Sequence, residues 1–339
     1  MVDLDIPRPP TSIITLMRLA AERDVRPESL FTGTRLSARA VKKPGAEVTA
    51  RQELRFIANL LEELDDPEAL GVEAGNHYHL TIYGIFGFAL VSSPSLRSAI
   101  DVGLRYVDLS FAMHKIHSRE AGGEFHFVLD PTGIPRRLQR FCIERTASSI
   151  RTIHRELAGP DLPNMPARFA FPPPKDITPY VDAFGVEPEF NADDSTVALP
   201  MQLLDEPLPQ GNEYTAAATQ QQCRQLLEER RRRTGLSGQV RDLMLSRPSD
   251  PPNADQIAAE LAMSPRTLRH RLAVEGTSYR ELLDEIRQRL AEEMLLTARL
   301  TVAETAQRLG YLELSSFSQA FRRWYGMSPR EFRTSHIGA

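Results

Sequence analysis

The chain has 339 residues and a formal net charge of −4, with apolar (41%) and charged (25%) fractions that are ordinary for a globular protein. This length predicts two domains, or three, with enough apolar residues to bury sizeable cores. The negative charge excludes a protein that binds phosphate over its whole surface, so any contact with nucleic acid must come from a local patch.

The N-terminal segment, MVDLDIPRPP, lacks the basic start and the apolar stretch of a signal peptide. The longest uncharged run, residues 74–96, has an apolar centre that is too short and too rich in glycine to span a membrane. The two cysteines, Cys142 and Cys223, lack CxxC spacing, which excludes a disulfide framework and favours a reducing compartment. We therefore expect a cytoplasmic protein with no membrane partner and two structural thiols.

The first 200 residues mix helical and strand periodicity. Apolar residues at helical spacing predict helices over residues 12–24, 48–64, 95–111 and 135–157. Residues 111–129 predict a β-hairpin, because Phe125, Phe127 and Leu129 alternate after Gly122 and Gly123. Short strands are expected at residues 167–171, 187–190 and 196–199. These elements predict an α+β domain, which we place at residues 12–205.

A polar helix is expected over residues 213–233, after the proline-rich residues 207–211. It ends in the charge run EERRRR, which is typical of a solvated helix end with arginines at the C-terminal side of the dipole. The alternative is a basic linker beside DNA. We assign residues 206–237 to a linker helix and residues 238–336 to an all-α domain.

Two segments of this all-α domain repeat one pattern, residues 253–276 (NADQIAAELAMSPRTLRHRLAVEG) and residues 301–326 (TVAETAQRLGYLELSSFSQAFRRWYG). Each has an alanine where two helices cross, a small residue at a turn, two apolar residues four apart, and a final glycine. These are Ala258, Ala262, Leu268, Leu272 and Gly276 in the first segment, and Ala306, Gly310, Phe317, Phe321 and Gly326 in the second. The pattern predicts two helix-turn-helix units, at about residues 254–275 and 302–325.

Capping residues mark several helix starts independently of the apolar pattern. Ser264 precedes a proline, and Thr301 and Ser328 each have a glutamate three residues later. A helix predicted between the repeats, over residues 278–297, would be roughly 30 Å long. Because major-groove faces on one side of B-DNA lie roughly 34 Å apart, this helix has the length to hold two recognition helices in adjacent grooves.

Residues 238–333 resemble the DNA-binding domain of the AraC/XylS family of bacterial transcription regulators, above all in RLGYLELSSFSQAFRRWYGMSPREFR, residues 308–333. The resemblance implies seven helices with two helix-turn-helix units joined by a long helix. The residues that it places at DNA are Arg266, Arg269 and His270 in the first recognition helix, and Leu314, Ser315, Ser316, Gln319 and the phosphate-binding Arg322 in the second. Arginine pairs best with guanine, so the first helix is expected to read sequence more strongly. We also expect Arg323 on the DNA side and Trp324 over the connecting helix.

Residues 83–107, YGIFGFALVSSPSLRSAIDVGLRYV, resemble the effector-binding domain of a subset of that family that is called arabinose-binding-like. The resemblance implies an α+β sensor domain in place of a cupin barrel. It does not identify the effector, and the effector-binding residues stay unassigned.

These features predict a sequence-specific transcription factor that binds double-stranded promoter DNA in two adjacent major grooves and responds to a small-molecule effector or to self-association. RNA polymerase and a second copy of the chain are further candidate partners. Two alternatives stay open: a DNA-repair or modification enzyme with the same DNA-binding module, and a ligand-independent regulator whose N-terminal domain only dimerises. We expect no catalytic residues, cofactor or metal, since His77 and His79 have no third ligand nearby.

Overall fold

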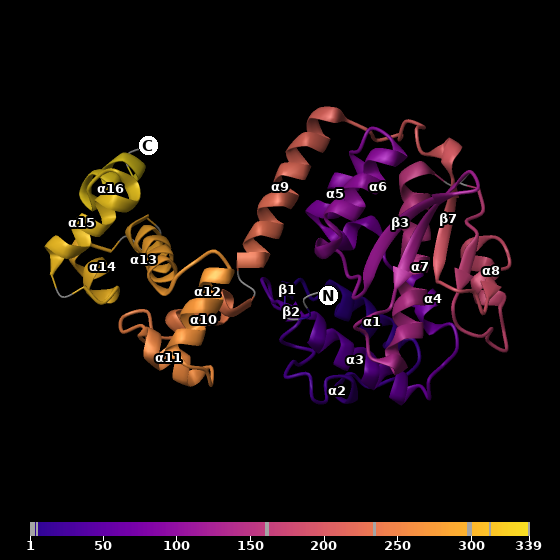
Figure 1. Cartoon of the computed structure of the whole chain (residues 1–339), viewed down its shortest axis with the longest axis horizontal. Helices are drawn as coiled ribbons and strands as arrows, with labels where there is room; N and C mark the ends of the chain where they lie inside the picture. The colour runs from indigo at the N-terminus through magenta and orange to yellow at the C-terminus, as the bar shows by residue number, and fades with distance from the viewer. Residues whose placement is uncertain are drawn as a thin grey trace. The chain divides into compact units, whose positions relative to one another are not determined.

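The computed structural model describes residues 4, 6–159, 163–232, 235–296, 300–311 and 313–337. The chain divides between Arg230 and Arg231 into two compact units, shown in Figure 1. The first unit contains helices and a five-stranded sheet, whereas the second contains helices only within the part described. The prediction of an α+β domain followed by an all-α domain is therefore confirmed.

The first unit contains nine α-helices and seven strands among its described residues. The helices are α1 (Thr11–Ala21), α2 (Pro27–Leu30), α3 (Ala50–Glu63), α4 (Leu70–Asn76), α5 (Ile85–Val91), α6 (Leu96–Arg105), α7 (Arg136–Ala158), α8 (Thr178–Phe184) and α9 (Glu213–Arg232). The strands are β1 (Pro7–Arg8), β2 (Val48–Thr49), β3 (Lys115–Ala121), β4 (Glu124–Asp130), β5 (Ala167–Phe169), β6 (Glu189–Phe190) and β7 (Thr196–Pro200). Three short 3₁₀ turns are η1 (Leu80–Tyr83), η2 (Val107–Leu109) and η3 (Met201–Leu203).

The main sheet has the strand order β3-β4-β7-β5-β6, and only the β5–β6 pair is parallel. The predicted hairpin is confirmed, because Ala121 pairs with Glu124 across Gly122 and Gly123. Both glycines have positive φ, at 61° and 82°, as a two-residue turn between twisted strands requires. The hairpin starts later than predicted, since residues 111–114 precede β3.

Helix α7 lies between two apolar cores of the first unit. It contributes Ile143, Ala147 and Ile150 to the core under the main sheet, and Phe141 and Cys142 to the core built by α1 and α3. α7 also packs against β7. The side chains along one helix therefore reach both halves of the unit.

Two glycines one turn apart let α4 lie directly against α7. A Cβ at Gly71 would lie 2.5 Å from the carbonyl oxygen of Phe141, and a Cβ at Gly75 would lie 2.5 Å from that of Arg145. Neither glycine has a positive φ, so each is needed for space and not for its backbone conformation. This close packing fixes the position of α7.

The segment predicted as one linker helix is divided between two helices. α9 ends at Arg232, and the next helix begins at Gly235, whose φ of 75° interrupts helical geometry. α9 is part of the first unit, because Cys223 and Leu227 lie in the core under the sheet. The charge run is solvated only in part, since Glu228 and Glu229 are exposed but Arg230 is buried. The side chains of its last residues lie outside the described part.

The second unit contains the seven helices that the family resemblance implies, counted over the described residues. They are α10 (Gly235–Ser246), α11 (Ala254–Glu260), α12 (Pro265–Val274), α13 (Tyr279–Leu296), α14 (Val302–Arg308), α15 (Leu314–Tyr325) and α16 (Pro329–Ile337). α13 connects two small cores, since Leu282 and Ile286 lie in the first and Ala291 and Leu295 in the second. No helix in the described part of the chain is long and apolar enough to cross a membrane.

Each helix-turn-helix unit has one residue in the left-handed region at its turn. Ala262 has a φ of 52° in the first helix-turn-helix, and Gly310 has a φ of 76° in the second helix-turn-helix. A Cβ at Gly310 would also overlap the carbonyl oxygen of Ser249, which lies in the loop between α10 and α11. The second turn therefore packs against the first half of the domain, and only glycine leaves the space for it.

Replacing Gly75 by alanine is expected to lower the free energy of unfolding by about 1–3 kcal/mol, because the new methyl group must push α4 away from α7. Urea denaturation measures the change. Gly103→Ala is the control, since a Cβ there meets only Leu90 Cδ2 at 3.7 Å. It is expected to stabilise the helix by about 0.5–1 kcal/mol. Equal effects of the two substitutions would contradict the packing constraint.

Gly310→Ala is expected to destabilise the second unit more than Gly326→Ala does. Both glycines have left-handed φ values, 76° and 73°, so both substitutions cost about 1–2 kcal/mol in backbone strain. Gly326 has nothing within 4 Å of its added Cβ, whereas Gly310 faces the backbone of Ser249. Denaturation of the two variants isolates this contact, and similar losses would show that the contact is not a constraint.

Candidate functional site

The helix α12 exposes three basic side chains away from its buried face. Leu268 and Leu272 are each 1% exposed and lie in the core, while Arg266, Arg269 and His270 are exposed. At 3.6 residues per turn, Arg266 and His270 project opposite the two leucines, and Arg269 projects from the adjoining flank. The structure thus brings the three residues predicted for the first recognition helix onto one solvent-facing surface.

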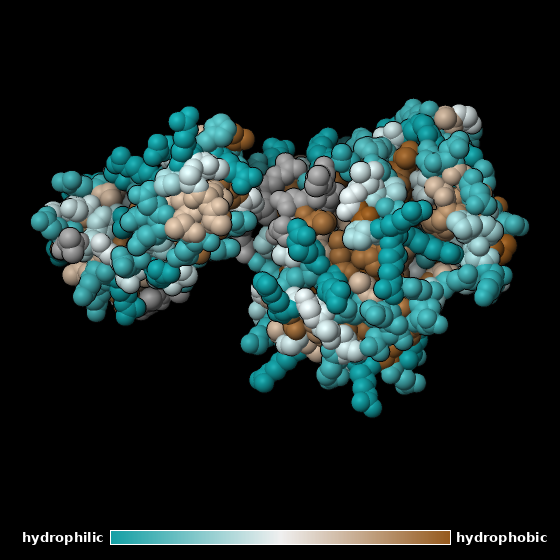
Figure 2. Space-filling model, turned by 60° about the horizontal axis from the view of Figure 1, so that its bottom comes forward, coloured by the Kyte–Doolittle hydropathy of each residue, from teal (hydrophilic) through white to brown (hydrophobic). Residues whose placement is uncertain are grey.

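The helix α15 has the same arrangement with fewer charges. Phe317 and Phe321 are fully buried, and the predicted DNA-facing residues are all exposed: Leu314, Ser315, Ser316, Gln319 and Arg322. Only Arg322 of this set is basic. The face of the C-terminal unit that Figure 2 shows is mainly hydrophilic.

The two helices begin differently. Ser264 caps α12, since its Oγ accepts a hydrogen bond from the backbone N–H of Thr267 at 3.1 Å. α15 begins after Glu313, whose side chain forms no capping hydrogen bond. The Oγ of Ser315 instead donates to Glu313 Oε2 at 3.1 Å. The first N–H groups of α15 thus have no side-chain cap among the described residues, an arrangement that suits a phosphate group.

Three side chains near the end of α15 are engaged with or near α13. Arg323 is exposed, and its guanidinium donates to Asp284 Oδ2 at 2.9 Å. The hydroxyl of Tyr325 donates to Glu292 Oε2 at 2.8 Å. Trp324 packs against the core that contains Ala291 and Leu295 of α13, and its ring lies 6.3 Å from the ring of Phe321. These contacts join α15 firmly to α13.

A further contact joins the turn of the second helix-turn-helix to α13. The guanidinium of Arg287 lies over the Tyr311 ring, 4.7 Å from its centroid. α13 itself has 18 residues, which corresponds to a length of about 27 Å. The spacing of α12 and α15 is therefore set by one helix together with the contact between Gly310 and Ser249.

The acid at the end of α12 is engaged within the domain. The carboxylate of Glu275 accepts the backbone N–H groups of Leu236 and Ser237, each at 2.8 Å. It thereby caps the start of α10, where a negative charge is favourable. Residues 265–274, which form α12 itself, contain no acidic residue.

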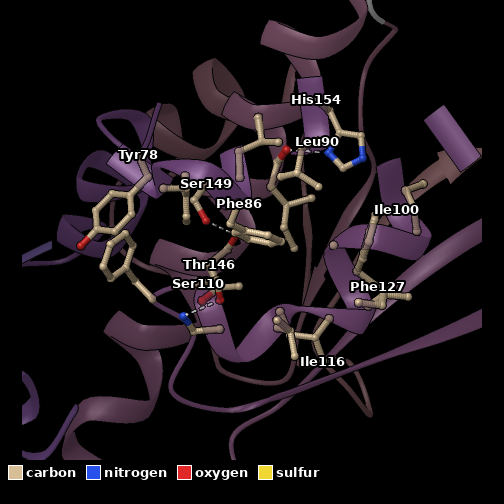
Figure 3. Close-up of a pocket in the computed structure, with 18 of the residues that line it drawn as sticks. Tyr78, Phe86, Leu90, Ile100, Ser110, Ile116, Phe127, Thr146, Ser149 and His154 are labelled. Atoms are coloured by element: carbon tan, nitrogen blue, oxygen red, sulfur yellow. Dashed lines mark hydrogen bonds between the residues drawn. The ribbon is translucent and has the colours of Figure 1, made fainter. Parts of the chain in front are cut away.

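The first unit contains a cavity of about 100 Å³ bounded by α5, α6, α7, β3 and β4. Figure 3 shows its apolar walls, with Phe86 and Leu90 on one side and Ile100, Ile116 and Phe127 on others. One wall comes from the segment that resembles the effector-binding domain. Sequence reasoning did not find the cavity, because its walls come from segments that lie far apart in the chain.

Among the described residues that line the cavity, Arg145 of α7 is the single charged one. It is buried, and its guanidinium donates to Glu53 Oε1 at 2.8 Å and to the carbonyl oxygen of Phe111 at 2.8 Å. Burial alone lowers the pKa of Arg145, but Tyr78 and Glu53 outweigh this effect and raise it. Arg145 therefore stays charged, and its charge is balanced inside the protein.

The hydroxyl groups of the lining also have partners within the chain. Thr146 is paired with His114 at 2.9 Å, and the Oγ of Ser149 donates to the Thr146 carbonyl oxygen at 2.9 Å. Tyr83 forms a hydrogen bond with Ser149, and Ser110 accepts the backbone N–H of Ala112 at 3.1 Å. The cavity thus has few free polar groups.

His154 is the exception in this lining. Its Nδ1 lies 2.7 Å from the carbonyl oxygen of Ile150, as the dashed line in Figure 3 marks. Burial lowers the pKa of His154 to about 4, so the ring is neutral at pH 7. Its Nε2 is buried and has no hydrogen-bond partner among the described residues.

The histidine and cysteine residues considered as metal ligands or nucleophiles do not form such a site among the described residues. His79 Nδ1 lies 2.5 Å from Glu156 Oε1, and the described residues include no group of three potential metal ligands. Cys142 and Cys223 are buried free thiols, and burial raises the pKa of each to about 11. Neither is an activated nucleophile.

Comparison with known protein families gives two matches. Residues 25–208 match the N-terminal arabinose-binding domain of AraC transcription regulators, and residues 257–335 match a helix-turn-helix domain. The solved structure of the transcriptional regulator CdpR from Pseudomonas aeruginosa has 26% sequence identity and a TM-score of 0.48, over 96% of this chain and 98% of that one.

Two relatives match nearly the whole chain. An uncharacterized HTH-type transcriptional regulator of Mycobacterium tuberculosis is 34% identical over 327 residues, which cover 94% of this chain and 93% of the relative. The ornithine utilization regulator of Pseudomonas aeruginosa is 31% identical over 322 residues, which cover 94% of each. With two helix-turn-helix units behind an α+β domain, the chain belongs to the AraC family of DNA-binding transcription regulators.

Proposed function

We propose that this regulator places α12 and α15 in two adjacent major grooves of promoter DNA. The observation that carries this proposal is the pair of exposed polar helix faces held in one compact unit by α13. The length of α13, about 27 Å, is near the roughly 34 Å between groove faces on one side of B-DNA. Because the units are in tandem, the half-sites form an asymmetric pair about one turn apart and not a palindrome.

The three basic residues of α12 read base edges. Arg266 and Arg269 pair with guanine through two parallel hydrogen bonds, and His270 contacts a neighbouring base. In α15, Ser315, Ser316 and Gln319 contact the groove, and Arg322 neutralises a phosphate. The paired arginines of α12 support its role as the stronger reader of sequence.

The first unit acts as the regulatory domain, with the cavity as its effector site. A ligand that binds one conformation better than another shifts the population of DNA-binding states. The cavity supports this proposal over that of a domain that only dimerises. Self-association and contact with RNA polymerase are compatible additions, since neither requires the cavity.

The chain acts as a regulator and not as a DNA-repair enzyme. Alkyl transfer to cysteine needs an accessible thiolate, whereas Cys142 and Cys223 are buried and their pKa values are raised to about 11. Mass spectrometry that found an alkyl group on either thiol after reaction with damaged DNA would overturn this assignment.

Arg269→Ala is expected to weaken binding to the specific site by about 1–3 kcal/mol and to relax the base preference at one position. Binding to random DNA is expected to change much less. Fluorescence anisotropy at fixed salt measures both affinities.

Arg271→Ala is the matched control, because Arg271 is exposed on the same helix but lies on the flank opposite to Arg269 and away from Arg266 and His270. This variant removes the same charge and is expected to keep the base preference. Equal losses on specific and random DNA for Arg269→Ala would reduce that residue to a phosphate contact. A footprint confined to one groove would contradict the two-groove arrangement.

A further inference from the structure

We propose that the cavity of the first unit takes a neutral, mainly apolar small molecule that carries one hydrogen-bond donor for His154. This inference rests on the proposed role of the cavity as the effector site. It sets the ligand class apart from the sugar that the name of the matching family suggests and from the amino acid in the name of one relative.

The apolar character of the ligand follows from the walls. Aromatic and aliphatic side chains from four segments of the chain surround the space, as Figure 3 shows for Phe86, Leu90, Ile100 and Phe127. The volume of about 100 Å³ is that of a small cavity. An engineered cavity of about 150 Å³ with similar walls in another protein stays dry and binds benzene.

A charged ligand lacks a counter-charge in this cavity. The lining, as far as the structure describes it, contains no acidic residue, so an ammonium group finds no carboxylate there. Arg145 is engaged by Glu53 and by the carbonyl oxygen of Phe111, so a carboxylate has to compete with an existing buried ion pair. A free amino acid carries both charges and meets both obstacles.

A sugar finds too few hydrogen-bond partners in this cavity. Thr146 and Ser149 already pair with groups of the chain, and Ser110 already accepts the backbone N–H of Ala112. A pentose carries several hydroxyl groups, and each one that is buried without a partner loses its hydrogen bonds to water. The cavity is suited to one such group and not to four.

His154 supplies the partner for that one group. A carbonyl oxygen only accepts hydrogen bonds, so Nδ1 must carry the proton that it donates to Ile150. In the neutral ring, Nε2 is then an acceptor, and it lacks a partner among the described residues. A ligand with an N–H or O–H group at the His154 end of the cavity satisfies this buried atom.

Four probes test this assignment on the full-length protein. Indole and benzofuran have nearly the same shape but differ in one atom, an N–H donor against a ring oxygen. L-Arabinose and L-ornithine represent the polar and the charged alternatives. Isothermal titration calorimetry is expected to show indole binding, benzofuran binding about tenfold more weakly because two acceptors then face each other, and neither polar probe binding.

Two variants locate the binding. Gly103 lines the cavity on α6, and a Cβ there meets only Leu90 at 3.7 Å, so Gly103→Leu is expected to fill the space and abolish indole binding. His154→Phe keeps an aromatic ring without the acceptor and is expected to bind indole and benzofuran equally. The cavity-filling variant keeps the test decisive if the His154 variant is unstable.

The proposal is overturned if indole does not bind, if L-arabinose or L-ornithine binds more tightly than indole, if indole and benzofuran bind equally, or if indole binding persists in Gly103→Leu. Promoter binding by the unliganded protein is measured separately. Absence of indole binding to the unmodified protein, with intact promoter binding, refutes the ligand class alone. Indole binding that leaves promoter affinity unchanged supports the ligand class and refutes the effector role.

Discussion

The close packing of α4 against α7 at Gly71 and Gly75 is the constraint on which the regulatory unit depends. The missing side chains allow backbone contact, which holds α7 at a fixed depth between two cores. In that position, Arg145 of α7 forms a buried ion pair with Glu53, and His154 of α7 lines the cavity. A looser contact would move both groups together, since they are carried by one rigid helix.

The DNA-binding unit depends on a similar contact in which backbone meets backbone. Gly310 lies against Ser249. Asp284 and Glu292 of α13 bind Arg323 and Tyr325 of the second helix-turn-helix. One contact is made by the turn of the second helix-turn-helix unit and the others by its second helix. The two recognition helices therefore behave as parts of one body, which suits a site with a fixed distance between its halves.

The sequence predicted the elements that carry local signals. Gly122 and Gly123 mark the hairpin, and the capping pair Thr301–Glu304 marks a helix start that the structure contains. Elements stabilised mainly by tertiary contacts were missed, including α4 and α5, which have only seven residues each and contain glycines that serve packing. The ion pair between Glu53 and Arg145 joins residues 92 positions apart, and no local pattern predicts it.

The packing of α9 connects the last helix of the first unit to the core beside the cavity. Cys223 and Leu227 of α9 belong to the same apolar core as Phe86 and Leu90 of the cavity wall. A ligand that rearranges this core would therefore also displace α9. This helix ends at Arg232, just before α10 begins at Gly235.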